Sequence, residues 1–330
     1  MQLLKEGIDF DSFLKAYDFQ VPYEVENRES GMNNTTRIIN AGSERFVLRI
    51  YNNHRDPAIV RLEHEVLAAL DRRDPPFRVP SPVRDKKGET VGIAGDGTVS
   101  ALYRYIEGER PDPEKPAHVF ALGRTAALLT SAMSRIEPAG APLYSPYYEL
   151  EDTYAAMDER AFLALPESFE ALAPIRVRFA MLQKEREGLR EAREAAARLP
   201  KQWIHGDLVF NNTVAQGDEI VGVLDFEFST KDARAMELAV IVADLLKPDD
   251  PGCGEKIGLL LGGYRESFRL SEEERRLLPA LMKLRLLDVA LHFAVRLRDG
   301  LDREDVLSGI IEQTAFGCGW INEYWEDEWL

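Results

Sequence analysis

The sequence predicts an α+β protein built as two lobes, with a β-rich N-terminal lobe and a mainly helical C-terminal lobe. Three observations lead to this prediction. The length of 330 residues corresponds to about two structural units of ordinary size. Segments of β-branched and aromatic residues dominate from residue 21 to about residue 106, and helical periodicity dominates afterwards. We therefore expect an N-terminal lobe over residues 1–106 and a C-terminal lobe over residues 107–330.

The composition excludes several classes of protein. Acidic residues outnumber basic residues by 57 to 41, and the formal charge of −16 would repel the phosphate backbone of DNA or RNA. The hydrophobic fraction of 45% is typical of a globular chain, which excludes general disorder. The two cysteines, Cys253 and Cys318, are far apart and form no CxxC, so neither a disulfide framework nor zinc spacing is present.

The chain also lacks the pattern of a membrane or targeting segment. No uncharged apolar run approaches the roughly 18 residues that a membrane helix needs. The first residues carry charges early and lack the apolar stretch of a signal peptide. We expect a cytoplasmic protein that binds neither nucleic acid nor a membrane, and whose surplus of acid suits a cationic small molecule.

The N-terminal lobe is expected to start with a short helix near Asp9 and to continue as a sheet. Three β-rich segments separated by turn residues predict a meander; they cover residues 21–26, 36–40 and 45–51. Asp56-Pro57 then has the form of a helix start, and apolar residues recur at helical spacing as far as Leu70. Two further strands are expected at residues 91–93 and 99–106.

The C-terminal lobe is expected to consist of helices around a small β insert. An amphipathic helix is expected over residues 117–135. Residues 167–199 predict a short helix and a long one, divided near Pro174. Short β segments follow at residues 202–205, 213–215 and 220–226, and the chain has a helical pattern from about Arg234 onward.

The most informative segment joins the ends of two apolar strands. The first strand ends in His205-Gly206-Asp207, and Asn212 follows five residues after the aspartate. The second strand ends in Asp225-Phe226-Glu227. Because a hairpin turn lies between them at residues 216–218, we expect the two strands side by side and the polar residues at one rim.

This set of residue types suits phosphoryl transfer. The attacking hydroxyl needs a carboxylate that orients it and accepts its proton, and Asp207 suits that role. Nucleotide phosphates need Mg²⁺, which prefers oxygen ligands such as those of Asn212 and Asp225. Alternatively, each residue could merely shape a turn, as Asp, Asn and Gly often do. Four specified residues at fixed spacing together with a second strand-ending acid favour the chemical interpretation.

His205-Gly206-Asp207-x-x-x-x-Asn212 with Asp225-Phe226-Glu227 resembles the aminoglycoside phosphotransferase and choline kinase superfamily, which has a bilobal, protein-kinase-like fold. The resemblance implies that Asp207 is the catalytic base and that Asn212 and Asp225 bind Mg²⁺. It also implies that His205 gives structural support to the catalytic loop. Within the superfamily, the order of motifs looks closest to homoserine kinase type II.

The same resemblance implies that the N-terminal lobe binds the nucleotide. Arg49 stands where the family has a phosphate-binding lysine, and an arginine can preserve the cationic function. Glu65 lies in the register of the helical glutamate that orients this cation, with Glu63 as the competing choice. Further nucleotide-binding positions are implied in a phosphate-covering turn and in the hinge between the lobes: Ser30, Gly31, Asn33 and Asn34 in the turn, and Tyr103, Tyr105 and Ile106 in the hinge.

These expectations describe an ATP- and Mg²⁺-dependent kinase that phosphorylates a hydroxyl of a homoserine-, aminoglycoside- or choline-like small molecule. Such acceptors carry an ammonium group, which acids of the C-terminal lobe could bind; the candidates are Asp152, Asp158, Glu159, Asp288 and residues 326–328. The alternative is a nucleotide-binding regulatory module of the same fold without catalysis, favoured by Arg49 alone. A protein Ser/Thr kinase is disfavoured because no Ala-Pro-Glu landmark follows Asp225.

Overall fold

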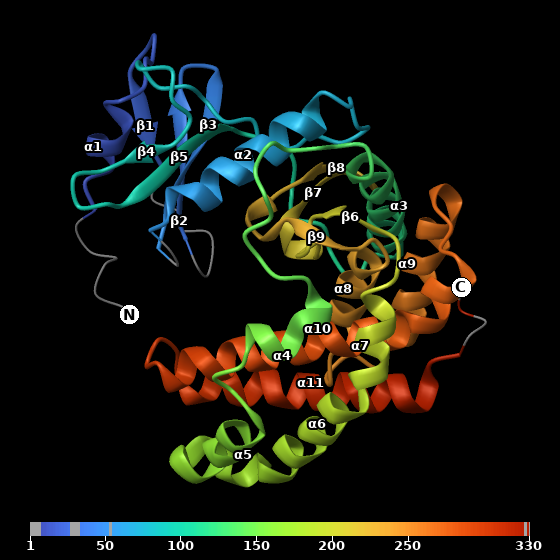
Figure 1. Ribbon diagram of the computed structural model, residues 1–330. Helices are drawn as coiled ribbons and strands as arrows, with labels where there is room; N and C mark the ends of the chain where they lie inside the picture. The colour runs from blue at the N-terminus through green and yellow to red at the C-terminus, as the bar shows by residue number, and fades with distance from the viewer. Residues whose placement is uncertain (1–7, 27–33, 53–54, 327–328, 330) are drawn as a thin grey trace.

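The computed structural model describes residues 8–26, 34–52, 55–326 and 329 (Figure 1). Its N-terminal lobe is an antiparallel sheet with strand order β1-β2-β3-β5-β4, which confirms the expected α+β class and the expected strands. The strands are β1 (Tyr23–Val25), β2 (Thr35–Ala41), β3 (Glu44–Tyr51), β4 (Gly92–Ile93) and β5 (Val99–Arg104). Two helices flank them, α1 (Phe10–Leu14) and α2 (Pro57–Asp71). Both helices begin as the sequence predicts, with an aspartate side chain that accepts a backbone hydrogen bond at the N-cap.

Strand β3 sets the direction of the side chains that matter for the site. Its alternate residues Phe46, Leu48 and Ile50 are buried in a core shared with α1. Because successive side chains of a strand point to opposite faces, Val47 and Arg49 point to the other face, where both line a cleft. The period-two pattern therefore places Arg49 on the functional side of the sheet.

The C-terminal lobe is mainly helical. Its helices are α3 (Pro116–Met133), α4 (Leu150–Thr153), α5 (Glu159–Ser168), α6 (Arg176–Gly188), α7 (Arg190–Ala196), α8 (Met236–Leu245), α9 (Cys253–Ser267), α10 (Glu272–Arg298) and α11 (Glu304–Tyr324). Four short 3₁₀ turns accompany them: η1 (Tyr147–Glu149), η2 (Glu170–Ile175), η3 (Phe210–Asn212) and η4 (Phe226–Phe228). In Figure 1 the long helices α10 and α11 run side by side, remote from the N-terminal sheet. No helix of the described ranges is long and apolar enough to cross a membrane.

The expected long helix up to residue 199 is wrong. Two helices, α6 and α7, occupy this segment, and the break between them falls at Gly188 and Leu189. Glycine has a high entropic cost in a helix, and Leu189 leaves helical geometry with ψ near 0°. The expected division near Pro174 is present, because Pro174 lies in η2, which separates α5 from α6.

The pairing of the short strands also differs from the expectation. Strand β6 (Lys201–Ile204) pairs with β9 (Thr230–Ala233), a strand that the sequence analysis missed. Strand β8 (Glu219–Val223), which leads to Asp225, pairs with β7 (Thr213–Gln216) instead. A hairpin turn joins strands that are adjacent in sequence, so β7 is the natural partner of β8, and β6 is paired by a later segment. The ends of β6 and β8 still meet, because the His205 ring and the Leu224 carbonyl oxygen are 2.8 Å apart.

Backbone hydrogen bonds fix the β7–β8 hairpin to segments on both sides of the lobe boundary. Arg78 bonds to β8 through Val221 and Val223, with nitrogen–oxygen distances of 2.8 and 2.9 Å. Glu109, just after the expected boundary, exchanges two hydrogen bonds with Ala215 of β7. Gly108 permits this close approach, because a Cβ atom there would lie 2.5 Å from the Ala215 carbonyl oxygen. The hairpin that carries the second acidic motif is therefore tied to the connection between the lobes.

Helices α3 and α9 pack closely through glycines, which leads to a stability prediction. A Cβ atom on Gly263 of α9 would lie 2.1 Å from the Phe120 carbonyl oxygen of α3. We expect Gly263→Ala to lower the free energy of unfolding by about 2 kcal/mol, since the helices must separate. The control is Gly258→Ala on the same helix, where no atom lies within 4 Å of the position of the added Cβ atom. This substitution should raise the free energy of unfolding by about 0.5–1 kcal/mol. Urea denaturation measures both, and equal stability of the two variants would contradict this account.

Candidate functional site

A cleft of about 730 Å³ is lined by residues of both lobes. Eight of the residues singled out from the sequence line it: Asn34, Arg49, Tyr103, Tyr105, Ile106, Asp207, Asn212 and Asp225. His205 is buried behind the lining, and Glu65 lies elsewhere on α2. Ser30, Gly31 and Asn33 of the expected phosphate-covering turn lie outside the described residues. The tertiary structure thus brings residues from five separate segments to one cavity.

His205 connects the two acidic motifs and is fully buried. Its Nε2 lies 2.8 Å from the Leu224 carbonyl oxygen, so this nitrogen donates a hydrogen to that acceptor. The other ring nitrogen, Nδ1, then accepts from the Asp207 backbone N–H at 3.2 Å. Burial lowers the pKa of His205 to about 4, so the ring is neutral at physiological pH. The His205 ring therefore links the loop that carries Asp207 to the end of β8.

Glu237, at the start of α8, also supports the loop that carries Asp207, a role that the sequence analysis did not identify. Its side chain is fully buried, and Oε2 accepts a hydrogen bond of 2.6 Å from the His205 backbone N–H. Burial raises the pKa of Glu237 to about 7, although hydrogen bonds from the backbone of His205 and Gly206 oppose the shift. The sequence signal for this role is that Glu237 directly precedes the apolar run 238–243. A carboxyl group beside such a buried segment needs a hydrogen-bond partner.

Asp207 lines the cleft and contacts Asn212 and Arg285. The Asn212 amide nitrogen donates to the Asp207 carbonyl oxygen at 2.8 Å and to Oδ2 at 3.1 Å. Arg285 of α10, which the sequence analysis missed, donates from Nη2 to Asp207 Oδ1 at 2.5 Å. Burial raises the pKa of Asp207 to about 6, and the charge of Arg285 opposes this effect. The carboxylate is therefore ionised at neutral pH and can accept a proton.

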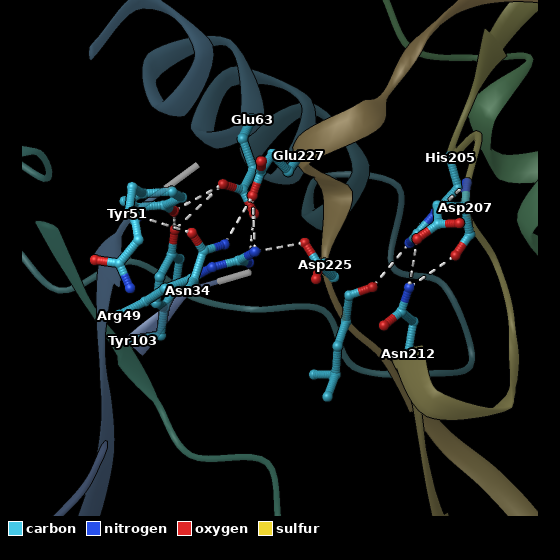
Figure 2. Close-up of polar contacts among 12 residues, drawn as sticks. Asn34, Arg49, Tyr51, Glu63, Tyr103, His205, Asp207, Asn212, Asp225 and Glu227 are labelled. Atoms are coloured by element: carbon cyan, nitrogen blue, oxygen red, sulfur yellow. Dashed lines mark hydrogen bonds and ion pairs between the residues drawn. The ribbon is translucent and has the colours of Figure 1, made fainter. Parts of the chain in front are cut away.

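Asp225 lies between the Asp207–Asn212 pair and a cluster around Arg49 (Figure 2). Its backbone has φ of +64°, in the left-handed region that aspartate tolerates better than most residues. The Asp225 Oδ1 atom accepts from Arg49 Nη2 at 2.8 Å. The same nitrogen donates to the buried Glu227 Oε2 at 2.8 Å, and Asn34 donates to that oxygen at 3.1 Å. Both acids of the second motif thus contact the cation of β3 across the cleft.

The helical partner of Arg49 is Glu63, and the expectation of Glu65 is wrong. Arg49 Nη1 lies 3.9 Å from Glu63 Oε1, and Glu63 is buried. Glu65 is exposed and accepts a hydrogen bond from the Gly140 backbone N–H at 2.8 Å. Residues two apart on a helix are separated by about 200° around its axis, so only one of the two glutamates can face the sheet. Burial raises the pKa of Glu63 to about 7, with Arg49 opposing the shift.

Two of the hinge residues, Tyr103 and Tyr105, contact other residues of the N-terminal lobe. The buried Tyr103 hydroxyl lies 2.8 Å from the Tyr51 hydroxyl and 2.9 Å from His64 Nε2. Tyr51 in turn donates to Glu63 Oε2 at 2.9 Å, so this network also orients the partner of Arg49. The Tyr105 ring lies 3.9 Å from the Arg45 guanidinium carbon, and its backbone N–H donates to the Arg45 carbonyl oxygen.

The donor set fits a divalent cation that arrives with phosphate groups. Among the described residues, no group of three or more His, Cys, Asp or Glu side chains is arranged to hold a metal ion. Asn212 and Asp225 line the cleft and offer one amide oxygen and one carboxylate. Mg²⁺ typically takes one or two protein carboxylates and completes its shell with phosphate oxygens and water. Close to these two residues, Arg49 contacts the side chains of Glu63, Asp225 and Glu227.

Comparisons with known proteins identify the family of the chain. The model of the "Phosphotransferase enzyme family" (APH) matches residues 24–282. The chain is 26% identical to a homoserine kinase of Methylobacillus glycogenes over 273 residues, covering 82% of this chain and 80% of the relative. A homoserine kinase of Nitrobacter winogradskyi is 27% identical over 290 residues, covering 82% and 78%.

Solved structures share the fold. A microcompartment-associated aminopropanol kinase superposes with a TM-score of 0.63 at 20% identity, covering 96% of both chains. A spectinomycin phosphotransferase in complex with ADP and spectinomycin superposes with a TM-score of 0.65 at 10% identity, covering 97% of both. Because the family model matches well over half of its residues, the chain belongs to the phosphotransferase enzyme family and is a small-molecule kinase.

Proposed function

We propose that the protein is an ATP- and Mg²⁺-dependent kinase that transfers the γ-phosphoryl group to a hydroxyl of a small molecule. The proposed acceptor bears an ammonium group, as homoserine, aminoglycosides and choline do, and homoserine is the first candidate. The observation that carries the proposal is the convergence of Asp207, Asn212, Asp225 and Arg49 on one cleft. The homoserine kinases at 24–27% identity favour the first candidate.

In this proposal Asp207 orients the acceptor hydroxyl and accepts its proton as the oxygen attacks phosphorus. Its side chain is 23% exposed, so an acceptor can reach the carboxylate. A base must be ionised to act, and the pKa of about 6 meets this condition at neutral pH. Turnover of the wild-type enzyme should therefore fall as the pH decreases through about 6.

Arg49 is proposed to bind the nucleotide phosphates. Its side chain is held by Glu63 on the helix side and by Asp225 and Glu227 on the opposite side of the cleft. Such contacts limit its rotamers and direct the guanidinium to the cavity. Asn212 and Asp225 would hold Mg²⁺, which when bound neutralises charge that develops on the phosphates. The presence of Asp207, Asn212 and Asp225 together favours catalysis over the alternative of an inactive regulatory module, which Arg49 alone favours.

Asp288 is the proposed seat of the acceptor ammonium group. It lies three residues after Arg285 on α10, hence on the same helix face, and it is partly exposed. Its Oδ1 accepts from the Tyr154 hydroxyl at 2.9 Å. The other candidates fit less well: Asp158 caps α5 through the Ala161 N–H, and Asp152 and Glu159 have exposed side chains.

An acceptor screen tests the proposed function. ATP consumption should be measured with homoserine, choline, aminoglycosides, sugars and hydroxy-amino acids, with and without Mg²⁺. Phosphorylation of an ammonium-bearing alcohol in the presence of Mg²⁺ is expected. Nucleotide binding without transfer to any acceptor would instead favour the regulatory module.

Replacing the base should remove chemistry and keep nucleotide binding. Asp207→Asn retains the shape of the side chain but loses its charge and basicity. We expect turnover to fall by about a hundredfold or more, with a similar affinity for Mg²⁺ and ATP. Steady-state assays and calorimetric nucleotide titration measure the two quantities. Loss of ATP binding in the folded variant would move Asp207 to the metal ligands, and unchanged turnover would remove it from the mechanism.

The two helical glutamates provide a matched pair. Glu63→Gln removes the buried partner of Arg49, and we expect kcat/KM for ATP to fall about tenfold or more. Glu65→Gln alters an exposed side chain two residues away, and the same quantity should stay within about twofold of the wild type. Equal effects of the two substitutions would contradict the assignment of Glu63.

Asp225→Ala should abolish Mg²⁺-dependent transfer, because the carboxylate that would bind the cation is lost. Calorimetry gives a readout independent of turnover: ATP affinity of the wild type should rise with Mg²⁺, and that of the variant should respond weakly. Asp218→Ala is the control, since Asp218 is exposed at the β7–β8 turn and pairs only with Lys115 among the described contacts. Near-normal Mg²⁺-dependent turnover of Asp225→Ala would rule out the metal role.

A further inference from the structure

The hydroxyl group of Tyr147, the first residue of η1, is bonded on two sides. It donates to the Gly206 carbonyl oxygen at 2.7 Å and accepts from Arg285 Nη1 at 2.9 Å. A phenolic hydroxyl can donate its hydrogen and accept another, so both of its functions are used here. Because Gly206 directly precedes Asp207, the first bond holds the peptide group that leads into the residue proposed as the base.

The peptide group between Gly206 and Asp207 is held at both of its ends. Its carbonyl oxygen accepts from the Tyr147 hydroxyl, and its N–H donates to His205 Nδ1 at 3.2 Å. Because a peptide group is planar, contacts at its two ends fix the orientation of the whole plane. Gly206 has φ of +80°, and a Cβ atom there would lie 2.8 Å from the Phe228 carbonyl oxygen. The position therefore requires glycine, whose backbone freedom has to be limited by contacts from outside the loop.

Tyr147 is itself fixed by contacts of its own backbone. Its N–H donates to Oδ2 of the buried Asp232 on β9 at 2.6 Å. Pro146 precedes it in an extended conformation, and the Pro146 carbonyl oxygen accepts from the Glu149 N–H at 2.9 Å, which closes the turn. The hydroxyl is therefore presented to the Asp207 loop from an element that is anchored independently of that loop.

A second route connects Tyr147 to the same carboxylate. The guanidinium of Arg285 that donates to the Tyr147 hydroxyl also donates from Nη2 to Asp207 Oδ1 at 2.5 Å. Tyr147 is thus connected to Asp207 through the backbone of Gly206 and through the side chain of Arg285. Both the backbone and the side chain of the proposed base depend on the position of one hydroxyl group.

We propose that Tyr147 is a positioning residue for the transfer reaction, whose hydroxyl fixes the peptide group before Asp207 and so holds the carboxylate within reach of the acceptor. The proposal rests on the proposed function, because that function assigns Asp207 the role of base. Tyr147 is not one of the described residues that line the cleft for the nucleotide. Loss of its hydroxyl should therefore slow the transfer step and leave nucleotide binding unchanged, since a small displacement of a catalytic group has a large effect on rate.

The first test separates kcat from KM in Tyr147→Phe, which keeps the ring and removes the hydroxyl. We expect kcat to fall about tenfold or more, while KM for ATP stays within about twofold of the wild-type value. A kcat within about twofold of the wild type would overturn the proposal. A rise in KM for ATP as large as the fall in kcat would also overturn it, because the damage would then extend to the nucleotide site.

Tyr148→Phe is the matched control. Tyr148 is the next residue of the same turn, and its hydroxyl accepts from Lys201 Nζ at 2.7 Å. The substitution removes the same group and also deletes a hydrogen bond, so it reproduces the structural cost of losing a tyrosine hydroxyl in η1. We expect kcat and KM for ATP to stay within about twofold of the wild type. Equal losses of kcat in the two variants would reduce Tyr147 to a structural contact.

Hydrogen exchange of the Asp207 backbone amide separates this proposal from the proposed function, because NMR of protein labelled with ¹⁵N-aspartate measures it without an acceptor. We expect exchange at least about tenfold faster in Tyr147→Phe than in the wild type, and an unchanged rate in Tyr148→Phe. If the wild type phosphorylates no acceptor and exchange is faster in Tyr147→Phe, the proposed function fails and the hold of Tyr147 on the loop stands. Equal exchange in Tyr147→Phe and the wild type overturns that hold, whether or not the enzyme is active.

A measurement on the wild type alone covers the case in which Tyr147→Phe does not fold. In an equal mixture of H₂O and D₂O, a hydroxyl that exchanges slowly gives two ¹³Cζ signals for its tyrosine, one for each isotope. We expect two signals for Tyr147, because its hydroxyl is bonded on both sides. A single averaged signal would overturn the proposal.

Discussion

The ion-pair cluster around Arg49 is the interaction on which the functional cleft depends. One guanidinium on β3 contacts Glu63 of α2 and both acids of the Asp225-Phe226-Glu227 motif. It therefore joins a strand, a helix and a loop from two lobes at one point. Charges buried in this way are costly unless they are paired, so loss of the guanidinium would leave the three acids without this cation.

A second set of contacts holds the Asp207 loop from behind. The neutral His205 ring bridges the loop and the end of β8, and Glu237 accepts a hydrogen bond from the His205 backbone. The β7–β8 hairpin is fixed to Arg78 and Glu109 by backbone hydrogen bonds. The polar groups that face the cavity are thus supported in part by two buried residues that do not line it, His205 and Glu237. This division agrees with chemistry that depends on positioning and charge more than on covalent intermediates.

Much of the fold could be predicted from local patterns. The cap aspartates Asp9 and Asp56, the strand alternation in residues 45–51 and the turn at residues 216–218 each depend on residues a few positions apart. The acids and amides of the two motifs could be recognised because they follow apolar strands at short, fixed intervals. The break of the long helix at Gly188 was missed, since Ala, Arg and Glu around it have high helix propensity.

The sequence by itself determined the family motifs, the two-lobe division of β and helical segments, and the residue types available for phosphoryl transfer. Tertiary structure alone decided that Glu63 and not Glu65 contacts Arg49, that β6 pairs with β9, and that Arg285 contacts Asp207. The physical reason is that a helical or strand pattern depends on neighbours within a turn or two. Which face of α2 packs on the sheet, and which side chain of α10 reaches the loop, depends on the packing of elements far apart in the chain.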